Sequence, residues 1–335
     1  MGIGLDIGST SIKIVYVGRQ GGSVHLLSAG VVRAPALGML SDSETDLVVI
    51  ATTIKKLMAD TKISGKEVAV ALPESEVVTR VIEMPNLSDQ ELSSAIEWEA
   101  EQYIPMPLSE SSLSHEVIER KEGGNMKVLV VASTKKLVEK YLKVCEMAKI
   151  KVTAVDTELI ALSRSLIGQG PGSTVLVDMG ARSTDIAIVS GGRVLFARSL
   201  ATAGEALTRA VALGLSMELN QAEEYKKTYG LDQSKLEAKV RGAMMPVFEV
   251  IVGEVKKAIE FYKSQSPSES IKSIVLGGGT AGLSGLVSEL ASKLGVEVAI
   301  GDPFASMIKD EMVAKALAGY APLYGVAAGL ALRDI

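Results

Sequence analysis

One short pattern occurs twice in this sequence, at positions about half a chain apart. It consists of an apolar strand that ends in aspartate, a tight turn of glycine and small residues, and a second strand, and it covers residues 4–14 and 177–186. A third strand follows each copy after a Gly-Gly pair, at residues 25–32 and 193–199. Two matching three-stranded meanders predict two related half-domains that face one another. A cleft with such turns on both walls suits a polyphosphate and its magnesium ion.

The composition sets the scale of the molecule and excludes several classes of protein. The chain has 335 residues, 47% of them apolar, so it is long enough for two or more domains. A formal charge of -5 gives no general attraction to nucleic acid or acidic lipid. The single cysteine, Cys145, excludes a disulfide framework within the chain and is expected in the core. The absence of such a framework fits a reducing cytosol, so we expect a cytoplasmic protein. Because no apolar run reaches about 18 residues, we expect no transmembrane helix and no direct membrane insertion.

Periodicity along the chain predicts alternating strands and helices, which is typical of a mixed sheet covered by helices. After the first meander, the order β-α-β-β-α-β resembles a split-βαβ module, and we interpret it as an insertion. A capping box at residues 88–91 opens its first helix. Residues 122–125 are expected to form a turn, residues 168–172 a linker, and Pro267 to end a helix. The predicted strands are 67–72, 77–84, 113–119, 127–133, 151–155 and 270–276, and the predicted helices are 43–61, 88–103, 135–148, 205–213, 220–229, 243–265, 283–294 and 320–332.

These elements divide the chain into four expected parts. The first core domain is residues 1–82, completed by 156–170 and 320–335, and the inserted subdomain is residues 83–155. The second core domain is residues 171–203, completed by 266–319, and residues 204–265 form a helical subdomain on it.

The two turns have the chemistry of phosphate-binding loops. Phosphate needs backbone N–H donors at close range, and glycine permits that approach. One hairpin alone is equally an ordinary turn whose aspartate accepts local hydrogen bonds, but two copies in matching meanders favour phosphate binding. Lys13, on the strand after the first turn, adds positive charge. The expected phosphate-binding residues are therefore Lys13 with Gly8, Ser9, Thr10 and Ser11 of the first turn and Gly180, Ala181, Arg182, Ser183 and Thr184 of the second.

Three aspartates flank these turns and are candidate metal ligands. Asp6 ends the first strand of one meander, and Asp178 and Asp185 bracket the turn of the other. Carboxylates are hard oxygen ligands that suit Mg²⁺, which keeps much of its hydration shell. We therefore expect Mg²⁺ to be held by these side chains through water.

A third glycine cluster, residues 277–282, matches the pattern G-x-G-x-x-G between a predicted strand and a predicted helix. A dinucleotide-binding fold is disfavoured, because Glu297, the acid that the fingerprint would use, is closer than the usual spacing of about 20 residues and too little chain follows. A loop at a helix N-terminus that packs on the sugar and base of a nucleotide explains the same residues better. The residues expected in this loop contact are Gly277, Gly278, Gly279 and Thr280.

In this order, the three segments resemble the motifs of the actin-like ATPase superfamily, which includes sugar kinases, FtsA and PilM. Residues 6–13 resemble its first phosphate motif, 178–185 its second and 277–280 its adenosine motif. The resemblance implies an α/β, ribonuclease H-like fold of two facing domains that binds ATP and Mg²⁺. It places the connecting helices at residues 156–161 and 320–332. It also places Glu223, Lys226 and Lys227 beside the adenine, although a solvated helix face with ion pairs explains them equally well.

Within the superfamily, the insert is similar to that of FtsA and, more closely, to that of the PilM family. The similarity lies in residues 84–87, 95–105 and 329–333, while the C-terminal membrane helix expected of FtsA is missing. The resemblance implies a cytoplasmic ATP-binding platform for type IV pilus assembly and twitching motility. Such a platform would bind the N-terminal cytoplasmic tail of PilN in a groove between the first domain and the insert. It would lie at the inner membrane through PilN, with pilus motor ATPases and the platform protein PilC as further partners.

Two other functions of the same fold stay open. One is a filament-forming division protein like FtsA, and the other is a small-molecule kinase, for which no substrate-binding aspartate stands out. The resemblance makes Glu158 the candidate for orienting an attacking water, and a helix-start carboxylate without chemistry explains it equally. Arg182 departs from the glycine-rich second loop of vigorous ATPases. We therefore expect slow or absent ATP hydrolysis, with nucleotide acting as a conformational ligand.

The only tryptophan, Trp98, lies on the first helix of the insert. It falls off the expected core stripe of that helix, which includes Tyr103. Burial in the core and an exposed anchor for a peptide are both compatible with this position. If the side chain is exposed, we expect Trp98, Tyr103 and Ile104 to contact the partner peptide.

Overall fold

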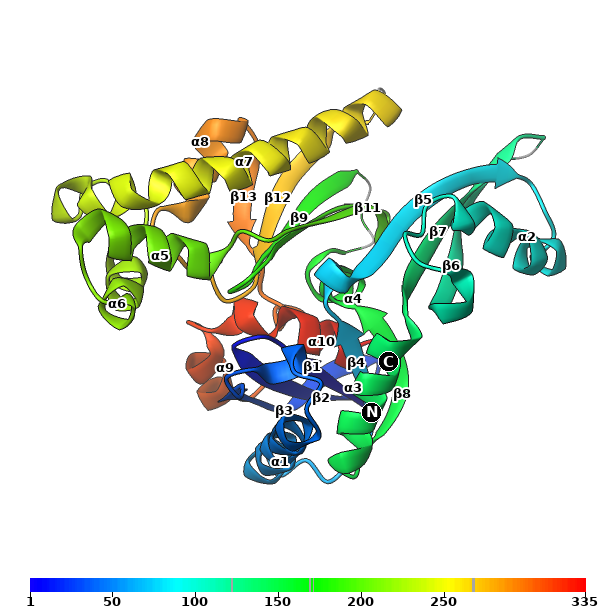
Figure 1. Cartoon of the computed structure of the whole chain (residues 1–335), viewed down its shortest axis with the longest axis horizontal. Helices are drawn as coiled ribbons and strands as arrows, with labels where there is room; N and C mark the ends of the chain where they lie inside the picture. Colours follow the sequence, from blue (N-terminus) through cyan, green and yellow to red (C-terminus); the bar gives the residue numbers. More distant parts are fainter. Residues whose placement is uncertain (122, 169, 171, 267–268) are drawn as a thin grey trace.

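The computed structural model describes residues 1–121, 123–168, 170, 172–266 and 269–335 (Figure 1). The expected turn at 122–125, the linker at 168–172 and the helix end at Pro267 therefore fall partly or wholly outside the described residues.

Two five-stranded sheets with the same strand order form the centre of the described molecule. In each, a three-stranded antiparallel meander continues into two parallel strands. The duplicated meanders and the mixed α/β fold are thus confirmed. The first sheet is β3-β2-β1-β4-β8, made of β1 (Gly2–Ile7), β2 (Ser11–Gln20), β3 (Ser23–Arg33), β4 (Glu67–Leu72) and β8 (Lys151–Thr157). The second is β11-β10-β9-β12-β13, made of β9 (Ser173–Met179), β10 (Thr184–Ser190), β11 (Arg193–Leu200), β12 (Ile271–Gly277) and β13 (Glu297–Ile300).

Helices cover the outer face of each sheet. On the first sheet, α1 (Glu44–Asp60) and α3 (Lys135–Met147) share one buried core with β1, β2 and β4. Leu47, Ile50, Ile54 and Leu57 of α1 form the buried stripe that the helical spacing predicts, and Cys145 of α3 is buried as expected. The second sheet is covered by α5 (Gly204–Leu215), α6 (Leu219–Tyr229), α7 (Lys239–Gln265) and α8 (Leu286–Leu294).

Two short helices lie between the sheets and join them. They are α4 (Glu158–Leu166) and α10 (Gly325–Ala331), the second preceded by the 3-10 helix η5 (Ala321–Tyr324). One buried cluster contains α4, α10 and inner-face side chains from both sheets. Small residues allow this close contact, since a Cβ atom added to Gly329 would lie only 1.7 Å from the carbonyl oxygen of Ala161. The crossing of α4 and α10 therefore fixes the floor of the cleft between the two halves.

A third, smaller sheet, β5-β7-β6, projects from the first half (Figure 1). It contains β5 (Val77–Pro85), β6 (Ser111–Arg120) and β7 (Asn125–Thr134), with α2 (Asp89–Glu101) packed against it. The capping box is present, because the Ser88 hydroxyl accepts from the Glu91 N–H while the Glu91 carboxylate accepts from the Ser88 N–H. We call this unit the insert.

The insert is smaller than the sequence predicts. The chain order β-α-β-β-α-β is correct, but its grouping into one module over residues 83–155 is wrong. Strand β8 pairs in parallel with β4 at the edge of the first sheet, and α3 packs in the core of that sheet. Helix α3 is buried against the first sheet and β8 is a strand of that sheet, so β5, α2, β6 and β7 form the insert.

Residues after β13 return to the first sheet earlier than expected. Phe304, Met307 and Leu317 pack against β2 and β3, and the Leu26 N–H donates to the Ile308 carbonyl. The assignment of residues 304–319 to the second domain is therefore wrong. The sequence analysis also missed β13, a four-residue edge strand.

The remaining helices of the described chain are short. They are α9 (Glu311–Leu317) and the 3-10 helices η1 (Gly38–Leu40), η2 (Glu74–Glu76), η3 (Leu108–Glu110) and η4 (Leu236–Ala238). Within the described residues, no helix combines the length and the apolar character that crossing a membrane requires.

Candidate functional site

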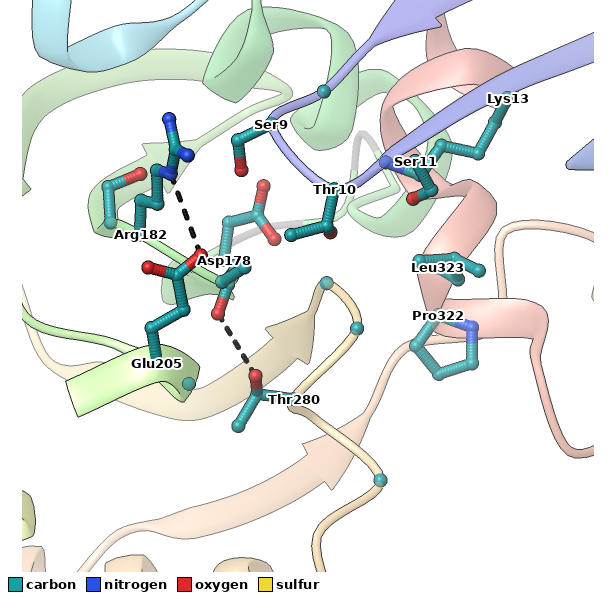
Figure 2. Close-up of a pocket in the computed structure, with 18 of the residues that line it drawn as sticks. Ser9, Thr10, Ser11, Lys13, Asp178, Arg182, Glu205, Thr280, Pro322 and Leu323 are labelled. Carbon is teal, nitrogen blue, oxygen red and sulfur yellow. Dashed lines mark hydrogen bonds and ion pairs between the residues drawn. The ribbon is translucent and has the colours of Figure 1, made fainter. Parts of the chain in front are cut away.

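A cleft of about 980 Å³ separates the two sheets above α4 and α10 (Figure 2). This volume is at the upper end of ordinary ligand sites, roughly 300–1,000 Å³. Both predicted turns line it, and so do the glycine loop after β12 and one face of α6. The predicted residues that line the cleft are Asp6, Gly8, Ser9, Thr10, Ser11, Lys13, Glu158, Asp178, Gly180, Ala181, Arg182, Ser183, Asp185, Glu223, Lys226, Lys227, Gly278, Gly279 and Thr280.

Two predicted residues do not line the cleft. Thr184 is fully buried, and its hydroxyl donates to the Thr202 carbonyl at 2.7 Å. Gly277 ends β12 under Leu162 of α4, whose methyl group lies 3.0 Å from the position of an added Cβ. Both residues hold the turns in place rather than face the cavity.

The two turns are built by the same hydrogen bond. The Gly8 N–H donates to the Ser11 carbonyl at 3.1 Å, and the Gly180 N–H donates to the Ser183 carbonyl at 3.0 Å. Ser9 and Thr10 are exposed at the tip of the first turn. The structure therefore presents two equivalent turns on opposite walls of one cavity, as the duplicated sequence predicts.

The glycine loop is tied directly to the second turn. The Thr280 N–H donates to the Met179 carbonyl at 2.9 Å, and the Thr280 hydroxyl donates to the Gly180 carbonyl at 3.0 Å (Figure 2). Gly278 has φ +85°, and a Cβ atom there would lie 2.3 Å from a carboxylate oxygen of Asp178. Only glycine fits this conformation and this close approach.

Four carboxyl groups converge at the bottom of the cleft around one lysine. Lys13 donates to Asp6 at 2.8 Å. Burial lowers the pKa of Lys13, but Asp6, together with Asp178 and Glu158, more than offsets this, so the pKa is raised overall. Burial, reinforced by Asp185, raises the pKa of Asp178 to about 7. Burial also raises the pKa of Glu158 well above its usual range, reinforced by Asp6, Asp185 and Asp178. The excess of buried acid favours the binding of a cation or of protons.

The aspartates fit Mg²⁺ held through water better than Mg²⁺ bound directly. Among the described residues, no three acidic, histidine or cysteine side chains lie close enough to hold one metal ion. Asp185 nevertheless has a buried carboxylate oxygen without a hydrogen-bond partner in the described chain. Hydrated Mg²⁺ would supply the missing donors, because its water ligands can reach several carboxylates at once.

Helix α6 contributes a paired acid and base, Glu223 in its middle and Lys226 in its last turn. Lys226 is buried and donates to the Gly204 carbonyl at 3.0 Å, and it forms an ion pair of 2.7 Å with Glu223. Burial opposes ionisation of Glu223, but Lys226 and Thr208 hold its pKa below the usual range. A solvated helix face therefore does not describe Lys226, whereas Lys227 is exposed as that interpretation expects.

Glu205, Tyr320 and Glu74 are among the residues at this site that the sequence pattern does not indicate. Glu205 lines the cleft and forms an ion pair of 3.5 Å with Arg182. Tyr320 lines the mouth of the cleft with 66% of its surface exposed. The Glu74 N–H donates to the Glu158 carboxylate at 3.1 Å. These side chains come from segments without a recognisable motif, so only the folded arrangement identifies them.

The three predicted partner-binding residues lie on the insert, away from the cleft lining. Trp98 is 77% exposed, which excludes burial in the core. Tyr103 is 40% exposed, and its ring lies under Arg80 with 5.4 Å between the guanidinium carbon and the ring centroid. Ile104 is buried in the core of the insert. Its side chain faces inward, so of the three predicted residues Trp98 and Tyr103 are the ones exposed to a partner, and contact by Ile104 stays a prediction.

Two matching sheets, with a phosphate-type turn on each wall of one cleft, define an actin-like ATPase fold. Solved structures agree in fold. They include EutJ from Carboxydothermus hydrogenoformans (TM-score 0.60, 18% identity, 99% of this chain and 89% of that chain covered). They also include MreB 5 of Spiroplasma citri bound to AMPPNP (TM-score 0.54, 14% identity, 98% and 93% covered).

Within this class, the chain belongs to the PilM family: the sequence model described as "Type IV pilus assembly protein PilM" matches residues 4–335. A solved "PilM-PilN type IV pilus biogenesis complex" has a chain with TM-score 0.86 and 28% identity, covering 99% of this chain and 98% of that one. The cell division protein FtsA of Streptococcus pneumoniae is 24% identical over 351 residues, which is 90% of this chain and 75% of FtsA.

Proposed function

We propose that this protein is a cytoplasmic, ATP-binding platform of type IV pilus assembly that binds the N-terminal tail of PilN. The tail would hold the platform at the inner membrane. The platform would link the membrane complex to the cytoplasmic pilus machinery, with motor ATPases and PilC as further partners. Membership of the PilM family supports the role in pilus assembly. The similarity to a chain of a PilM-PilN complex supports PilN as the partner.

One observation carries the proposal of nucleotide binding. The two turns share the same Gly N–H to Ser carbonyl hydrogen bond and face the same cavity. Backbone N–H groups and hydroxyls from both walls would hold the phosphates, and the loop at Gly278 and Thr280 would pack on the sugar and base. Lys226 and Glu223 would flank the base. Mg²⁺ would neutralise phosphate charge, held through water by Asp6, Asp178 and Asp185.

We expect little or no ATP hydrolysis. Glu158 lines the cleft and is the only candidate we assign for orienting a water. Burial raises its pKa, which favours the protonated form, and a protonated carboxyl group is a poor base. Bound nucleotide would then act through the shape of the cleft, by binding one arrangement of the two halves better than another.

Calorimetry tests both binding activities with two variants that control for each other. Ser9→Asp places a negative charge at the exposed tip of the first turn, so it should weaken Mg-ATP binding at least about tenfold through repulsion of phosphate. It should leave binding of a cognate PilN tail peptide, measured without nucleotide, unchanged. Trp98→Ala should do the reverse, since an exposed aromatic residue is a typical binding hot spot. Equal ATP affinity of Ser9→Asp and the wild type would remove the turns from the site.

The two alternative functions, a filament-forming division protein and a small-molecule kinase, are tested by different experiments. A filament-forming division protein is favoured by the similarity to FtsA over 90% of this chain. ATP-dependent pelleting at micromolar concentration would support it, and a protein that stays in the supernatant would not. A kinase would show rapid phosphoryl transfer in a screen of small-molecule acceptors.

A further inference from the structure

Arg182 occupies an unusual position among the residues of the two turns. The first turn, Gly8 to Ser11, has no charged side chain, whereas the second has Arg182 at its tip. Arg182 lines the main cleft and also a smaller cavity of about 200 Å³. Ser9 and Glu158 line the same two cavities. Arg182 therefore borders the same two cavities as the first turn and Glu158.

The present partner of Arg182 is a weak one. Glu205, at the start of α5, lies 3.5 Å from its Nε, and both side chains are more than one-third exposed (Figure 2). Exposed ion pairs of this kind contribute little to stability, because water screens them. The Glu205 main chain is held independently, since its N–H donates to the Ala181 carbonyl at 2.8 Å. Arg182 can thus leave Glu205 without disturbing the turn.

Glu205 also keeps a second basic neighbour. Arg209, one turn further along α5, lies 3.8 Å from the other Glu205 oxygen. Departure of Arg182 therefore leaves no unpaired carboxylate behind. A phosphate group is a stronger partner for Arg182 than Glu205 is, because a guanidinium group donates two parallel charge-assisted hydrogen bonds to it.

We infer that Arg182 sets the preference of the site for nucleoside triphosphates over diphosphates, by exchanging Glu205 for the terminal phosphate. The inference rests on the proposed nucleotide site. Glu158 is the candidate for orienting water, so the phosphate nearest to it is the terminal one, and Arg182 shares that corner of the cleft. A diphosphate lacks the group that draws Arg182 from Glu205. The empty and diphosphate states then keep the ion pair, and the triphosphate state breaks it.

Calorimetry with Mg-ATP and Mg-ADP on the full-length protein tests this exchange. Arg182→Ala should weaken ATP binding about tenfold or more and ADP binding less than twofold, which abolishes the preference. Glu205→Gln should strengthen ATP binding severalfold, because Arg182 no longer has to leave a carboxylate. Arg209→Ala is the matched control: it touches the same Glu205 and lines neither cavity, so the ATP/ADP ratio should stay that of the wild type.

Several results would overturn the inference. Equal losses of ATP and ADP affinity in Arg182→Ala would make Arg182 a contact of the inner phosphates. A wild-type protein that binds both nucleotides equally would leave no preference to explain. A wild-type protein that binds neither would remove the nucleotide site itself, so the two failures are distinguishable. Melting temperatures of all variants within a few degrees of the wild type would exclude misfolding as the cause.

Discussion

At the scale of single residues, Glu74 links the cleft to the insert. It lies in η2, between β4 and β5, and is 4% exposed. Its main-chain N–H donates to Glu158, while its own carboxylate accepts from the Thr79 hydroxyl at 2.9 Å. Its other carboxylate oxygen has no hydrogen-bond partner within the described chain. An acid buried in this way costs stability once it ionises, and burial raises its pKa to about 7.

This cost predicts a pH dependence of stability. The unfolded chain loses the Glu74 proton near pH 4.5 and the folded chain near pH 7, so the wild type loses stability as pH rises between these values, by up to about 3 kcal/mol. Glu74→Gln does not titrate. The free energy of unfolding of this variant should therefore exceed that of the wild type by more at pH 8 than at pH 5. Urea unfolding without nucleotide or metal measures the difference. Glu76→Gln, on an exposed neighbour, should show no such change. If the free energies of unfolding of Glu74→Gln and the wild type differ by the same amount at both pH values, the pKa of Glu74 is not raised.

At the scale of elements, local periodicity predicts individual segments well, whereas tertiary contacts decide how they group. The stripe of α1 and the capping box at Ser88 depend on residues a few positions apart, and both are confirmed. The partners of α3 and β8 depend on burial against a sheet formed by chain more than 60 residues away, which the sequence pattern does not encode. The site divides in the same way: the duplicated turns were predictable, while Glu205 and Glu74 were not.

The helices α4 and α10 cross with their main chains in very close contact at Gly329 and Ala161. A Cβ atom on Gly329 would overlap the Ala161 main chain, so Gly329→Ala must push the two helices apart. We expect a loss of about 3 kcal/mol or more in unfolding free energy. Gly253→Ala in α7 is the control: its Cβ would meet open space, and alanine favours a helix by about 1 kcal/mol over glycine. Thermal unfolding of both variants measures the contrast, and equal stabilities would contradict the close crossing.

At the scale of the whole molecule, the insert touches both halves. Its first strand, β5, continues from Glu74 of η2 in the first half and also packs against β11 of the second sheet (Figure 1). Arg193, at the start of β11, donates to the Ile118 carbonyl of β6 at 2.5 Å and lies 3.7 Å from Glu116. A ligand that draws the two walls of the cleft together therefore also changes or fixes the position of the insert.

This geometry predicts that nucleotide and PilN tail affect each other's binding. Mg-ATP would tie the second sheet to the first and, through Arg193, hold the insert in one position, so the peptide would spend less free energy on ordering its groove. We expect the peptide to bind about fivefold tighter or more with saturating Mg-ATP, and ATP to gain the same factor from the peptide. In Arg193→Ala, this increase in affinity should fall towards onefold. The affinities for peptide alone and for Mg-ATP alone should each stay within about twofold of the wild-type values.

Arg19→Ala is the matched control, because Arg19 is an exposed side chain beside the corresponding Gly-Gly turn of the first sheet. It should leave the coupling factor at its wild-type value. Titrations of peptide with and without Mg-ATP, and of Mg-ATP with and without peptide, supply all four affinities and check that the two factors agree. If Arg193→Ala retains the full factor, the contact between β11 and β6 does not transmit it. The continuous chain from β4 through Glu74 to β5 would then be the route to examine, and Glu74→Gln would be the variant to titrate next.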